Sequence, residues 1–202
     1  MEQQETKIAK KDLIRKKTGY PGMEIHKSGE VEYLTFPALE GLNIVTHMVT
    51  SRLGGVSTGD CASFNFSYAR DTSREAVDEN FRRAAGVFGT TSDAFVCSDQ
   101  THTTNIRRVE KEDAGKGVTK EKDYRDVDGL ITNVPGLILG TFYADCVPLL
   151  FVDPVHHAIG CSHSGWRGTV GEMGKKTVEA MREAYGSRPE DIFAAIGPSI
   201  CQ

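Results

Sequence analysis

The sequence lacks long hydrophobic runs: no run approaches the ~20 apolar residues that span a bilayer. Its N-terminus, MEQQETKIAKKDLIRKK, is polar and lacks the apolar stretch of a secretory signal. These absences predict a cytoplasmic protein without a membrane partner.

An excess of basic residues is also missing. The chain has 24 Lys and Arg residues against 28 Asp and Glu residues, which gives a formal net charge of -4. Surfaces that bind nucleic acids are usually basic. The charge balance therefore predicts no nucleic-acid partner.

Close CxxC pairs are absent, and the number of cysteines is five, which is odd. A disulfide framework is not expected in a chain of 202 residues with this spacing. The cysteines are better explained as thiols, metal ligands or buried small side chains. The GxGxxG fingerprint and the phosphate-loop lysine motif are missing too, so neither type of nucleotide fold is indicated.

A hydrophobic content of 39% in 202 residues suits one domain with a real core. We expect a polar N-terminal tail over residues 1–20 and a single domain over 21–202. Helical spacing predicts two convincing helices, one capped by Thr72 and one that starts after Gly168 and ends at Gly186. Strands are predicted at 31–36, 42–50, 94–98, 105–109, 137–144, 147–153, 157–163 and 192–197. Many strands with few helices predict an α/β or α+β sheet protein.

Cys146 interrupts two apolar runs, beside Asp145 and before Pro148. A proline cannot donate to a strand ladder, so we expect the strand to break or bulge there, which would place side chains in a cleft. A buried cysteine acting as a small hydrophobe is the alternative. Asp145 weighs against that alternative, because a carboxylate in a core needs a partner.

Two histidines complete a candidate group with Cys146. His163 ends one predicted strand and His102 interrupts another. One cysteine and two histidines with an open fourth position would suit a catalytic zinc ion. A thiol nucleophile with a histidine base would use the same residues, and the residue types alone leave both readings open.

Arginines provide candidate anion sites. Arg167 precedes Gly168 and a predicted helix, where backbone N–H groups and the helix dipole favour an anion. Arg52, beside two glycines, could supply a second guanidinium for phosphate. An ordinary surface arginine is the alternative for each.

The motifs RLGGVS, SFNF, QTH, DVDGL, YADCVPLLFVD, HSGWRGTVG and AAIGPSI follow one another in this order. From about Val45 to the C-terminus the chain therefore resembles the YfiH/LACC1 family, the laccase-domain proteins formerly called polyphenol oxidoreductases. The resemblance implies an α+β (α/β) fold, a layered mixed-sheet sandwich with helices outside, as in CNF1/YfiH-like proteins. It also implies a zinc-dependent purine nucleoside phosphorylase, with adenosine deaminase and methylthioadenosine phosphorylase as related activities.

The same resemblance implies roles for individual residues. It implies that three residues are the metal ligands of Zn²⁺: His102, Cys146 and His163. It places Arg52, Asn65 and Arg167 at the substrate, and it makes Cys146, Asp145 and Arg167 catalytic. The small-molecule partners would be a purine nucleoside and phosphate.

Three other functions remain as alternatives. Laccase-like polyphenol oxidation needs copper, which is less expected because six scattered histidines are too few for a multicopper centre. A cysteine hydrolase that edits peptidoglycan precursors would use Cys146 as its nucleophile. An inactive binding domain is the third alternative, because family members continue beyond the position of Gln202 and the domain is expected to be C-terminally incomplete.

The chain departs from the family pattern at several positions. Tyr143 replaces the usual threonine before ADC, Ser164 replaces alanine in HAGWRG, and Thr103 stands where glycine is frequent. Cys161 stands where alanine is common, on the same strand face as His163. We expect Cys161 to be a buried spacer and the fourth zinc position to stay open.

Overall fold

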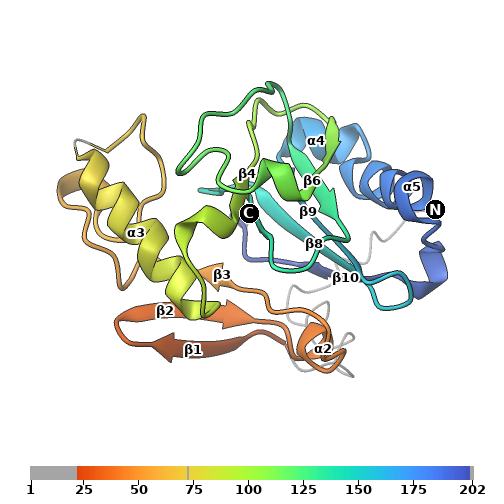
Figure 1. Ribbon diagram of the computed structural model, residues 1–202, viewed down its shortest axis with the longest axis horizontal. Helices are drawn as coiled ribbons and strands as arrows, with labels where there is room; N and C mark the ends of the chain where they lie inside the picture. Colours follow the sequence, from red (N-terminus) through yellow and green to blue (C-terminus); the bar gives the residue numbers. More distant parts are fainter. Residues whose placement is uncertain (1–21, 72, 201–202) are drawn as a thin grey trace, which may run out of the picture.

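The computed structural model describes residues 22–71 and 73–200, which form three sheets and helices α2 to α5 (Figure 1). The predicted N-terminal tail, residues 1–20, and the predicted helix cap Thr72 lie outside the described residues.

The first sheet is antiparallel, in the order β1-β2-β3. It consists of β1 (Glu24–Ser28), β2 (Val31–Thr35) and β3 (Val49–Thr50), so the strand predicted over 42–50 forms only at its end. Pro37 has no N–H group and begins the short helix α2 (Pro37–Glu40), which ends β2. Phe36, directly after β2, donates its N–H to Nε2 of His47 at 2.8 Å. In a longer strand this N–H group would instead donate to a backbone carbonyl of the neighbouring strand.

The second sheet has five strands in the order β10-β8-β9-β6-β5. Its strands are β5 (Ile106–Arg108), β6 (Gly129–Thr132), β8 (Val147–Asp153), β9 (Ala158–Ser164) and β10 (Phe193–Ile196). Only β5 and β6 are parallel neighbours; the other pairs are antiparallel. Four of them coincide with predicted strands, whereas no strand was predicted over the residues of β6.

The break predicted at Pro148 is wrong. Pro148 lies inside β8, in regular register opposite His163. His163 donates its N–H to the carbonyl of Asp128 on its other side, so Pro148 has no ladder bond to make with β9. The irregular backbone comes before the strand, at residues 144–146.

The sheets and helices are stacked in layers (Figure 1). Helix α5 (Met173–Tyr185) packs on one face of the five-stranded sheet, where the Ser162 and Thr177 hydroxyls lie 2.7 Å apart. The other face packs against the parallel pair β4 (Phe95–Cys97) and β7 (Ile138–Gly140). Helix α3 (Arg74–Val87) covers that pair from outside. The predicted layered mixed-sheet fold with helices outside is confirmed.

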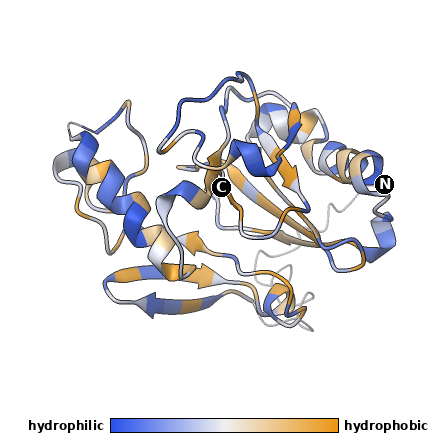
Figure 2. Cartoon of the chain, in the orientation of Figure 1, coloured by the Kyte–Doolittle hydropathy of each residue, from blue (hydrophilic) through white to orange (hydrophobic). Residues whose placement is uncertain are grey.

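Hydrophobic residues follow these layers: in Figure 2 the central strands are coloured mainly as hydrophobic, and much of α3 is hydrophilic. Three clusters of buried side chains form the core, one below α3, one between the sheets and one below α5. The middle cluster is made by Val96, Val109, Tyr124, Val127, Leu130 and Cys161. This middle layer also leads directly to the candidate site, because Cys161 is two residues from His163.

Both helices differ from the prediction at their starts. Ser73 caps α3 by accepting the N–H of Ala76 on its hydroxyl at 3.1 Å. The second predicted helix is divided into α4 (Trp166–Val170) and α5, with Glu172 left-handed at φ 59° between them. Arg167 is therefore in the first turn of a helix of five residues, whose dipole is weaker than that of the long helix expected. No helix among the described residues has the length and hydropathy that crossing a bilayer requires.

Candidate metal centre

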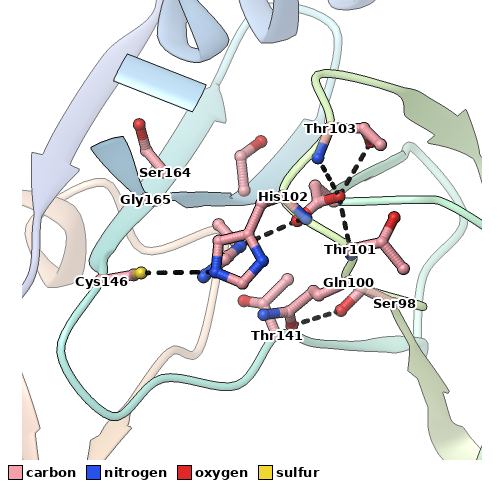
Figure 3. A network of polar contacts seen from close by, with 12 residues as sticks. Ser98, Gln100, Thr101, His102, Thr103, Thr141, Cys146, Ser164 and Gly165 are labelled. Atoms are coloured by element: carbon pink, nitrogen blue, oxygen red, sulfur yellow. Dashed lines mark hydrogen bonds and ion pairs between the residues drawn. The ribbon is translucent and has the colours of Figure 1, made fainter. Parts of the chain in front are cut away.

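The structure brings together the three side chains that the sequence analysis grouped. The ligand atoms of His102, Cys146 and His163 all lie within 4.8 Å of one another. Cys146 Sγ is 3.9 Å from His102 Nε2 (Figure 3), and the two imidazole rings meet edge to face with centroids 4.9 Å apart. His163 is buried, Cys146 half-buried and His102 exposed, so the group has one side open to solvent.

The hairpin of β8 and β9 positions two of these residues. Val147 pairs with Ser164, so Cys146 and Gly165 face each other one position further on. A Cβ atom on Gly165 would lie 2.9 Å from Cys146 Sγ and 3.0 Å from His102 Cδ2. Gly165 therefore leaves the space that the cysteine and the histidine occupy (Figure 3).

Asp128 organises the group, although the sequence analysis did not select it. Its buried carboxylate accepts backbone N–H groups from Thr101, His102 and Thr103 at 3.1, 3.1 and 2.8 Å. It also accepts the Thr103 hydroxyl at 2.8 Å. Three successive N–H groups around one anion form a nest, and His102 takes the left-handed conformation at φ 65° within it.

The same carboxylate fixes His163. Asp128 Oδ1 lies 2.8 Å from His163 Nδ1. Burial works to raise the pKa of Asp128, but hydrogen bonds from His163, Thr103 and Thr101 outweigh it and hold the pKa below its usual range. An ionised carboxylate can only accept, so Nδ1 carries a proton, and in the neutral imidazole Nε2 then has a free lone pair. A histidine that gives its other N–H to a carboxylate is the usual arrangement in metal sites.

Tyr143 closes the group on another side. Its ring centroid is 5.8 Å from that of His163, and its hydroxyl donates to the carbonyl of Ser162 and lies against the Thr141 hydroxyl. Burial raises the pKa of Tyr143, so the phenol is neutral at ordinary pH. The residue that departs from the family pattern thus supports the imidazole ring of His163.

The other predicted site residues have different surroundings. Asp145 is exposed and Cys146 is only half-buried, which agrees with the argument that the carboxylate weighs against a buried cysteine. Arg167 is exposed, with its guanidinium 5.3 Å from the centroid of the Trp166 ring. The guanidinium of Arg52 donates to the carbonyl of Ala62, and the amide of Asn65 bonds to Ser67 and Asp71. These side-chain hydrogen bonds of Arg52 and Asn65 thus run within their own loop, 52–71.

Cys161 is buried in the core between the sheets, and no metal-capable group of the described residues includes it. Burial raises the pKa of its thiol to about 12, which disfavours the thiolate that a metal requires.

We expect Cys161→Ala to leave zinc affinity unchanged and to lower the free energy of unfolding by about 1 kcal/mol, the cost of a cavity the size of a methyl group. Chelator competition and urea denaturation measure the two quantities. A large loss of zinc affinity at unchanged stability would make Cys161 a ligand.

A second metal-capable group among the described residues is Glu24, His26 and Glu40. The Nε2 atom of His26 lies 2.8 Å from the Thr35 hydroxyl and 4.0 Å from the carboxylate of each of the two glutamates. Both glutamates are exposed, and no buried carboxylate orients the imidazole. The group around Asp128 is therefore the better-built site.

The chain is similar to several known proteins. The family model "Multi-copper polyphenol oxidoreductase laccase" matches residues 46–202. A relative, "Purine nucleoside phosphorylase YlmD" of Bacillus subtilis (strain 168), is 39% identical over 153 residues, 75% of this chain and 55% of its own length. "Adenosine deaminase RL5", from an unknown prokaryotic organism, is 35% identical over 136 residues, 67% of this chain and 51% of its own.

A solved structure, that of YlmD from Geobacillus stearothermophilus, superposes with a TM-score of 0.78 at 33% identity. The match covers 87% of this chain and 65% of that one. The chain thus spans about half the length of the curated relatives it matches.

Proposed function

The chain belongs to the multi-copper polyphenol oxidoreductase laccase family, the YfiH/LACC1 family that its motifs predicted, and we propose that it acts as a zinc-dependent purine nucleoside phosphorylase. The observation that carries the proposal is the convergence of His102, Cys146 and His163 within 4.8 Å, with Asp128 behind His163. Relatives that cover most of this chain are named purine nucleoside phosphorylases.

The donor set supports zinc. One thiol and two imidazoles suit zinc, and three protein ligands leave one coordination position for substrate or water. Asp128 supplies the carboxylate that usually orients a ligating histidine. The family name mentions copper, but the described residues bring only these three nitrogen and sulfur donors together at one place.

In phosphorolysis, an oxygen of phosphate attacks the ribose C1′ atom, the bond from C1′ to the purine N9 breaks, and the base leaves with a proton. His102, Cys146 and His163 would hold the zinc ion, which would supply Lewis-acid polarisation to this reaction. We assign phosphate binding to the exposed Arg167, whose planar guanidinium suits a phosphate oxygen pair. We assign proton transfer to Asp145, which lies next to Cys146 and whose carboxylate faces solvent.

The test combines metal analysis with turnover on the 202-residue chain and, in parallel, on a longer relative. We expect about one zinc per chain, and release of hypoxanthine from inosine that requires phosphate. Hypoxanthine release that does not depend on phosphate, or copper with phenol oxidation, would reject the proposal.

Arg167→Lys should raise the KM for phosphate about tenfold and leave the KM for inosine unchanged, because lysine keeps the charge but loses the planar fork. Initial rates at varied phosphate measure the effect. Arg182→Lys, an exposed arginine in the last turn of α5, is the matched control and should behave as the wild type. A wild-type phosphate KM in Arg167→Lys would place Arg167 outside the phosphate site.

Adenosine deamination is the second candidate, favoured by the relative named adenosine deaminase and by the open side of the site at His102. Ammonia release from adenosine in the absence of phosphate would distinguish deamination from phosphorolysis.

The cysteine-hydrolase alternative is supported by the 3.9 Å contact between Cys146 Sγ and His102 Nε2, a thiol next to a histidine base. A covalent adduct on Cys146 of metal-free protein, formed during turnover, would favour that alternative.

A further inference from the structure

We propose that Trp166 is the stacking surface for the purine base, and that it determines specificity for purine over pyrimidine nucleosides. This inference rests on the proposed function and adds to it the group that recognises the base. None of the residues assigned so far offers an aromatic face to a bicyclic base, since Tyr143 is held against His163.

Exposure of the indole is the first observation. Trp166 is 72% exposed, although it is the largest apolar side chain in the sequence and its only tryptophan. Tryptophan has the largest apolar side chain, so contact with a ligand would bury a large apolar area of an exposed indole beside a candidate site.

Position is the second observation. Trp166 follows Gly165 directly, and neighbouring Cα atoms are about 3.8 Å apart. The Gly165 position borders both Cys146 and His102, the two solvent-facing members of the metal-capable group. Trp166 is thus the residue directly after the one that borders the two solvent-facing members of this group.

The backbone that carries the indole is held firmly. Thr169 donates its N–H and its hydroxyl to the carbonyl of Gly165, at 2.8 and 3.0 Å. The hydroxyls of Ser164 and Thr169 lie 3.0 Å apart, which ties the turn to the end of β9. A residue fixed in this way can bind a flat base without a large cost of ordering.

The neighbouring charge suits the second substrate. The guanidinium of Arg167 lies over the indole ring, 5.3 Å from its centroid, in cation–π geometry. It occupies one face of the indole and leaves the other for a base. A neutral purine on the indole and an anionic phosphate on the guanidinium would therefore be neighbours.

Because Trp166 is the only tryptophan, its fluorescence reports on this residue alone. We expect inosine and hypoxanthine to quench or shift the emission of the zinc-loaded protein. Ribose and inorganic phosphate, added alone at the same concentrations, should change it little.

Variants provide a second measurement. Trp166→Ala should raise the KM for inosine about 5- to 150-fold, the range that loss of one base–aromatic stack produces, with an unchanged KM for phosphate. Trp166→Phe should recover most of the loss. Val170→Ala, at a 78% exposed position of the same helix, is the matched control and should leave both KM values unchanged.

The outcomes separate the two proposals. Phosphorolysis of inosine with no purine-dependent emission change, and with a wild-type inosine KM in Trp166→Ala, would overturn the stacking role and leave the proposed function intact. A purine-dependent emission change without any phosphorolysis would support stacking and reject the proposed function. Absence of both would reject both.

Discussion

Replacing Cys146 with alanine is expected to lower the affinity for zinc by more than about 100-fold, beyond the range seen when only an outer partner of a ligand is lost. Cys146 would supply the only sulfur among the three donor atoms, and two imidazoles would remain. Zinc per chain, measured after dialysis, should fall close to zero, and inosine phosphorolysis should fall with it.

Two variants sharpen this experiment. Cys146→Ser keeps the size but replaces a soft thiolate with a hydroxyl, so its zinc affinity should also fall steeply. Cys61→Ala is the matched control, because Cys61 is another half-buried cysteine whose sulfur lies 3.3 Å from the carbonyl of Arg70. Full zinc content in Cys146→Ala would disprove the ligand assignment, and equal losses in Cys146→Ala and Cys61→Ala would indicate general damage to the fold.

The predicted strands were recovered where the sequence pattern is local. Residues 147–153 form β8 as predicted, and 157–163 differs from β9 by one residue at each end, because an apolar run between turn residues is sufficient to specify a buried strand. The register of these two strands then places Cys146 and His163 at one end of the sheet. His102 was grouped with them by residue type and by the family motifs, and the structure brings it within the same group.

The remaining differences depend on contacts that no local pattern contains. The Asp128 carboxylate bonds to residues 25 to 35 positions away in the sequence. The motif DVDGL was therefore recognised, but no local pattern indicates that Asp128 orients His163. A signal was present: an acidic residue directly before the apolar strand β6 is buried only if several donors surround it. At the division between α4 and α5, a Cβ atom on Gly171 would lie 2.8 Å from the side chain of Thr104, a contact between residues far apart in the sequence.

Asp128→Asn is expected to damage both stability and zinc binding, because it keeps the shape but replaces one acceptor with a donor. The carboxylate accepts five hydrogen bonds, from Thr101, His102, Thr103 twice and His163. An amide nitrogen in the place of Oδ1 leaves the N–H of His102 unpaired, and in the place of Oδ2 it leaves the N–H groups of Thr101 and Thr103 unpaired. Each buried unpaired donor costs about 1–3 kcal/mol, so the free energy of unfolding should fall by at least about 1 kcal/mol.

Zinc affinity should fall by about 10- to 100-fold in the same variant, as is usual when the carboxylate behind a ligating histidine is lost. If the amide nitrogen faces His163, its Nδ1 atom must accept and the proton moves to Nε2, the atom that would bind the metal. The ¹⁵N chemical shifts of the imidazole report this tautomer directly.

Asp126→Asn is the matched control for this change. Asp126 is exposed, two residues away in the same loop, and its side chain accepts only the Thr101 hydroxyl among the hydrogen bonds found. Its left-handed backbone, at φ 56°, suits asparagine, so this variant should keep both stability and zinc affinity. If Asp128→Asn kept its zinc affinity and the Nδ1-protonated tautomer of His163, the carboxylate would serve only to hold the loop that carries His102.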